Sequence, residues 1–166
     1  MSLFVAAIGA TVTAIFELTV GPYLRVGDAQ PHLVFILAII WTVAVGLEGG
    51  LVWAFFGGIA HDVLAQRPLG ASSFALIISV GVAASITRPF IRIRPLVVVP
   101  AVALLSLVYS MTLFVLLGAL GSSVASSNPV AALAPGVVYD TLIAVIVGPL
   151  AVAMHDRHTV EERADW

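Results

Sequence analysis

Residues 49–70 read Gly-Gly-Leu-Val-Trp-Ala-Phe-Phe-Gly-Gly-Ile-Ala-His-Asp-Val-Leu-Ala-Gln-Arg-Pro-Leu-Gly, a long apolar run that ends in a carboxylate and a turn. A helix needs about 17–25 predominantly apolar residues to cross the hydrocarbon core of a bilayer. The segment Gln66–Gly70 contains proline and glycine, which are typical of a turn that ends a helix. The stretch therefore predicts a membrane-spanning helix over Gly49–Ala65.

The composition of the whole chain agrees with this prediction. Of the 166 residues, 61% are hydrophobic and 10% are charged, whereas soluble domains have about 45–50% apolar and about 25% charged residues. A small water-soluble domain could not bury so much apolar surface. The composition indicates an integral membrane protein and excludes a soluble enzyme. It also excludes nucleic-acid binding, since no basic patch could neutralise a phosphate backbone. Without cysteine, disulfides and cysteine-based zinc sites are excluded as well.

Six apolar runs, bounded by proline, glycine and arginine, predict six transmembrane helices. We expect these helices over Leu3–Val20, Pro31–Val45, Gly49–Ala65, Ala71–Thr87, Pro100–Leu120 and Leu133–Met154. Pro149 lies inside the last run and predicts a kink or an early end of that helix. The predicted fold class is an all-α, polytopic bundle over residues 1–154, followed by a short polar cytoplasmic tail over residues 155–166.

The distribution of arginine predicts the orientation of this bundle. Arg88, Arg92 and Arg94 gather between the fourth and fifth runs. The positive-inside rule places this basic loop in the cytoplasm, and six spans then put both termini on the cytoplasmic side. The loop is also suited to contact anionic lipid or, as a less favoured alternative, a cytoplasmic protein. The first ten residues lack a basic segment, so we do not expect a cleaved signal peptide.

A stripe of small residues follows the third run. Gly50, Ala54, Gly58 and Asp62 recur every fourth residue and therefore share one helix face. Small residues let membrane helices approach closely. The stripe predicts either packing inside this bundle or, as the less favoured alternative, a docking face for the helix of a second protein.

Polar residues near the predicted external ends of three runs suggest a second site. Glu17, His61, Asp62 and Asp140 all fall in the outer half of the predicted bundle. They are candidates for an outer polar cavity; alternatively, each acid reaches the membrane surface or a local arginine. For Asp62 we consider the headgroup zone, a pair with Arg67, or an anchor inside the bundle. No His-x-x-x-His or paired acidic motif is present, so we expect no metal site.

The stretch 49–70 resembles the signature of the MreD family, the rod shape-determining membrane proteins of bacteria. Gly58, Asp62, Leu69 and Gly70 match its glycine-rich third span and the following Leu-Gly, whereas His61 replaces a commoner apolar residue. The resemblance implies a non-enzymatic component of the elongation machinery in the inner membrane, without a cofactor. It implies binding to an MreC-like single-span protein. Contacts to a RodA-type glycosyltransferase, a class B penicillin-binding transpeptidase and MreB are implied as well, the first two indirectly.

MreD-like bundles are also similar in fold to the substrate-binding subunits of energy-coupling-factor transporters. Such a subunit is the alternative function, for which the outer polar residues are candidates. These subunits often carry an alanine-rich docking motif on their first span, and Ala6, Ala10 and Ala14 lie four residues apart here. A membrane enzyme is a third class, and we find no convergent set of nucleophile, base or metal ligands for it.

Overall fold

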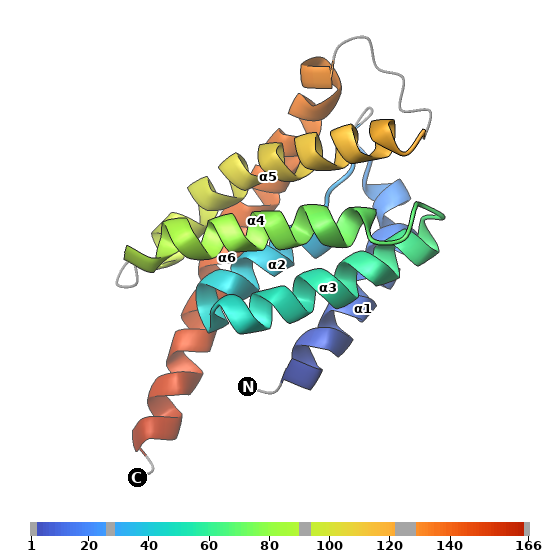
Figure 1. The fold of residues 1–166 in the computed structure, drawn as a ribbon. Coiled ribbons are helices and arrows are strands. Elements are labelled where there is room, and N and C mark those ends of the chain that lie inside the picture. The colour runs from blue at the N-terminus through green and yellow to red at the C-terminus, as the bar shows by residue number, and fades with distance from the viewer. Residues whose placement is uncertain (1–2, 26–28, 90–93, 122–128, 165–166) are drawn as a thin grey trace.

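The structure is a computed structural model that describes residues 3–25, 29–89, 94–121 and 129–164; for residues 94–95, 129–132 and 154–164 it describes the backbone only. These parts of the chain form an all-α bundle (Figure 1). Its elements are α1 (Leu3–Val20), the short 3-10 helix η1 (Gly21–Leu24), α2 (Leu33–Val45), α3 (Leu47–Leu64), α4 (Ala71–Thr87), α5 (Arg94–Ala119) and α6 (Pro129–Ala164).

Three segments are long and apolar enough to cross a membrane: Leu3–Leu24, Leu96–Ala119 and Leu133–Ala153. The apolar helices α2 and α4 are shorter, with 13 and 17 residues. Both chain ends lie toward the lower part of Figure 1. The all-helical bundle is thus confirmed, these three segments are candidate membrane spans, and the number of spans stays a prediction.

Helix α2 is the centre of the bundle. It contacts each of the other five α-helices, and nine of its 13 residues are buried. Around it, α1 contacts α3, α3 contacts α4, α4 contacts α5, and α5 contacts α6. In the described residues α1 and α6 do not contact each other. The outer helices therefore form an open ring, and the gap between α1 and α6 is backed by α2.

The predicted helix ends agree best where a turn is strongly encoded. Helix α4 has the predicted bounds. Helix α3 ends at Leu64, and Gln66 takes a left-handed backbone with φ 54°. The Arg67 amide then donates to the Asp62 carbonyl at 2.9 Å, which is the hydrogen bond of a Schellman motif. This motif brings the chain from α3 directly to the start of α4.

Two helices are longer than predicted. Helix α5 begins at Arg94 and contains Pro100, because Pro95 occupies the first turn, where a missing N–H is harmless. Helix α6 begins at Pro129 and continues through Pro149 to Ala164. Of the two alternatives predicted at Pro149, the early end is therefore wrong and the kink stays a prediction; the predicted polar tail, 155–166, is helical as far as Ala164.

Candidate functional site

Asp62 binds the N-terminus of the next helix. Its side chain is completely buried. The amide of Gly70 donates to Oδ2 at 2.8 Å, and the amide of Ser72 lies 3.1 Å from both carboxylate oxygens. The first amides of a helix have no partner within the helix, and the positive end of the helix dipole favours an anion. Asp62 thus anchors the start of α4 to α3, and in the described residues it forms no ion pair with Arg67.

Gly58 brings the same two helices into close contact. A Cβ atom at Gly58 would lie 2.5 Å from the backbone nitrogen of Ser73, on α4. The Ser73 hydroxyl donates to the carbonyl oxygen of Phe55 at 3.1 Å. Gly70 has φ +91°, a conformation that favours glycine. Gly58, Asp62 and Gly70 therefore form one α3–α4 junction, which explains why these residue types occur at this spacing.

The rest of the predicted stripe faces this chain's own helices. Ala54 is completely buried, and a Cβ at Gly50 would overlap Thr42 of α2 and lie 3.0 Å from Val80 of α4. On the neighbouring face, a Cβ at Gly57 would lie 2.8 Å from Val34 Cγ1. The small residues of α3 are thus placed where α2 and α4 pack against it.

Glu17 binds the N-terminus of the central helix. It is 2% exposed. Its Oε2 accepts a hydrogen bond of 2.7 Å from the Val34 amide, in the first turn of α2. Its Oε1 lies 3.2 Å from Nε2 of His61, on α3. One carboxylate therefore joins α1, α2 and α3.

Asp140 binds the same helix end from the other side. The amide of His32 donates to Oδ1 at 2.9 Å, and the His32 ring nitrogen Nδ1 lies 3.0 Å from Oδ2. The Ser106 hydroxyl of α5 also donates to Oδ2. The His32 ring packs edge-to-face on Tyr109, with ring centroids 5.6 Å apart. Asp140 thus joins α2, α5 and α6.

The three buried acids share one physical role. Each accepts backbone N–H groups at the start of α2 or α4, two helices that begin inside the protein. Burying a carboxyl group away from water is costly unless it is hydrogen-bonded, and the bonds from helix amides offset this penalty. The polar core therefore replaces water at helix ends that the fold buries.

A polar cavity lies beside this network. It has a volume of about 270 Å³, and its polar lining residues are Glu17, Arg25, Gln30, His32, His61, Arg67 and Ser110. Of the four residues predicted to form an outer cavity, Glu17 and His61 line it. Asp62 and Asp140 do not; they are engaged at helix N-termini. Sequence reasoning did not identify His32 or Ser106, because a histidine before an apolar run and a serine within one give no signal of a partner distant in sequence.

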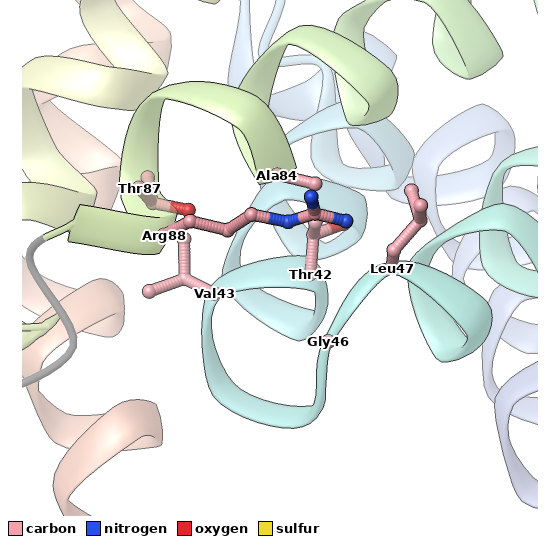
Figure 2. Close-up of a pocket in the computed structure, with 7 residues that line it drawn as sticks. All are labelled: Thr42, Val43, Gly46, Leu47, Ala84, Thr87 and Arg88. Carbon is pink, nitrogen blue, oxygen red and sulfur yellow. The ribbon is translucent and has the colours of Figure 1, made fainter.

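Arg88, the first arginine of the predicted basic loop, lies at the opposite end of α2. Figure 2 shows the Arg88 side chain extending from the end of α4 toward Thr42, in the last turn of α2. A cavity of about 150 Å³ is lined by these two residues together with Val43, Gly46, Leu47, Ala84 and Thr87. A cation is favourable near the carbonyl end of a helix. Arg94 is the first residue of α5, and Arg92 lies outside the described residues.

Metal-ligating side chains do not cluster in the described residues: no group of three or more histidine, aspartate or glutamate side chains there is suited to hold an ion.

No curated protein and no solved structure matched the chain. A family model, described as rod shape-determining protein MreD, matches residues 1–155. The chain therefore belongs to the MreD family of rod shape-determining membrane proteins.

Proposed function

We propose that this protein is a non-enzymatic scaffold of the bacterial rod elongation complex, which binds an MreC-like single-span protein and supports control of peptidoglycan synthesis. It lies in the inner membrane with six spans and both termini in the cytoplasm. Membership of the family supports this role. The buried carboxylates support it too, because their contacts join helices of the bundle.

The observation that carries the proposal is the gap between α1 and α6. An apolar groove of about 310 Å³ follows this gap, lined by Val12, Thr13 and Phe16 of α1, Leu33, Ile36 and Leu37 of α2, and Ile143 and Val147 of α6. Membrane helices associate mainly by close packing of side chains. A single apolar helix placed here would close the ring around α2, and we assign this position to the MreC-like partner.

The remaining members of the complex are reached through this partner. The RodA-type glycosyltransferase and the class B penicillin-binding transpeptidase contact the scaffold indirectly, and MreB lies on the cytoplasmic side. Arg88 and the neighbouring arginines, Arg92 and Arg94, make the proposed cytoplasmic end basic, which suits contact with anionic lipid.

A site-specific crosslinking experiment tests the proposed surface. A photo-reactive amino acid replaces Val12 or Val147 in the groove, and in control variants it replaces Leu104 or Val115, exposed on α5. We expect the groove positions to crosslink a single-span partner in the native membrane and the control positions to give little product. Equal labelling from both sets, or labelling from α5 alone, would contradict the groove assignment.

One observation favours a second function, a substrate-binding subunit of an energy-coupling-factor type transporter. In that function, the polar cavity beside Glu17 would hold the substrate. The alanines of α1 are evidence against the transporter function. Ala6, Ala10 and Ala14 are at most 1% exposed, so they are not available to dock a coupling protein. The scaffold is therefore the function that the geometry supports better.

A further inference from the structure

The polar cavity of about 270 Å³ carries an excess of positive charge. Its charged lining residues are Arg25, Arg67 and Glu17. The charge of Glu17 is engaged by the Val34 amide at 2.7 Å and by His61 at 3.2 Å. Neither arginine forms an ion pair with another described residue. Two guanidinium groups thus border the cavity without a described counter-charge.

A buried nitrogen in the wall of the cavity also lacks a partner. His61 is 4% exposed, and its Nε2 lies beside Glu17. Its other ring nitrogen, Nδ1, is buried and has no hydrogen-bond partner in the described part of the chain. Buried polar atoms are normally hydrogen-bonded, but this atom has almost no exposed surface, so the contacts open to a ligand in the cavity come from the two arginines.

The backbone places Arg67 at the cavity. The left-handed Gln66 and the hydrogen bond from the Arg67 amide to the Asp62 carbonyl define the turn that carries this side chain. Arg25 comes from the end of η1, in a different part of the sequence. The two cations thus approach from separate elements, as in sites whose polar groups converge on one ligand.

From these observations we propose that the cavity binds a small anionic group, a phosphate or a carboxylate, between Arg25 and Arg67. Guanidinium groups bind both anions through paired hydrogen bonds. The volume is slightly below the usual range of about 300–1,000 Å³ for ligand pockets, so it suits one such group with few additional atoms. The group belongs either to a soluble ion or to the headgroup of an anionic lipid.

The test measures thermal stability of the purified full chain. Inorganic phosphate or acetate is titrated at constant ionic strength against chloride, in detergent and in phosphatidylcholine nanodiscs with and without phosphatidylglycerol. The variants are Arg67→Gln and Arg25→Gln, the second at an exposed position. Arg88→Gln is the matched control for the phosphate and acetate titrations, since Arg88 borders the other cavity, near the end of α2.

We expect the wild type and Arg88→Gln to show the same saturable rise in melting temperature with phosphate or acetate. Arg67→Gln and Arg25→Gln should weaken binding about tenfold or more, as for loss of a hydrogen bond to a charged group. A rise with a soluble anion identifies that source, and a rise only with phosphatidylglycerol identifies a lipid headgroup. The proposal is overturned if no anion stabilises the protein, or if both cavity variants respond like the wild type. The scaffold role does not depend on either result.

Discussion

The substitution Gly58→Ala tests the α3–α4 junction with a single added methyl group. The new Cβ would lie 2.5 Å from the Ser73 backbone nitrogen, whereas ordinary contact begins at 3.4 Å. Because the Ser73 Cα atom lies closer still, the helices would have to separate by at least 0.9 Å (3.4 − 2.5). Both opposing atoms are backbone, so no side-chain rotation relieves the clash. A gap of about 0.5–1 Å forfeits a quarter to a half of each dispersion contact, and overpacking costs about 1–3 kcal/mol.

The expected free energy of unfolding is therefore lower by about 1–3 kcal/mol, with additional loss where the separation stretches the hydrogen bonds from Gly70 and Ser72 to Asp62. The matched control is Gly81→Ala on α4, where a Cβ meets no atom within 4 Å. Alanine is the better helix former there by about 0.5–1 kcal/mol. Reversible unfolding in mixed detergent micelles, followed by tryptophan fluorescence, measures both variants. Equal stability of Gly58→Ala and the wild type would refute the close-contact argument.

Three further substitutions separate the forces in the polar core. The same unfolding measurement checks the first two, and amide hydrogen exchange checks the third. Asp62→Asn should lower the free energy of unfolding by about 1–3 kcal/mol, since a neutral amide replaces the carboxylate bound to two helix amides. The control Glu48→Gln, at an exposed position, should leave it nearly unchanged. Equal effects of the two substitutions would contradict the role of Asp62 as a buried anchor. Gly70→Ala should lower the free energy of unfolding by about 1–2 kcal/mol. The cause is backbone strain at a φ of +91° alone, because an added Cβ would meet no atom within 4 Å. An unchanged midpoint of unfolding would exclude that strain. Asp140→Asn should destabilise the start of α2 and so increase hydrogen exchange at the His32 amide. Unchanged exchange at His32 would contradict this role of Asp140.

The predicted helices were most accurate where local sequence marks a helix end. Gly70 and Arg88 flank α4, and both its bounds were predicted. Helix α5 begins earlier than predicted, because Pro95, and not Pro100, lies in its first turn. In a membrane bundle an interior proline is tolerated when neighbouring groups satisfy the freed carbonyl, so proline alone does not locate a helix end.

The candidate cavity shows what hydropathy leaves undetermined. The sequence predicts how far along a helix each polar residue lies, and in the structure Glu17 and His61 line one cavity. Which way the acid faces depends on the packing of helices distant in sequence. Asp140 accepts a hydrogen bond from His32, 108 residues away, and Asp62 accepts hydrogen bonds at the start of α4. The need of buried helix N-termini for an acceptor accounts for both positions, but it appears only once the fold is known.

Affinity purification of the tagged protein from its native host in mild detergent, with quantitative mass spectrometry, most directly tests the scaffold function. We expect stoichiometric recovery of a single-span MreC-like protein, with a RodA-type glycosyltransferase and a class B penicillin-binding transpeptidase in smaller amounts. Substituting Val12 and Val147 of the groove by tryptophan should reduce that recovery, whereas tryptophan at Leu104 should not. Stoichiometric recovery of an ATPase pair with a coupling membrane protein would contradict the scaffold function and establish a transporter subunit.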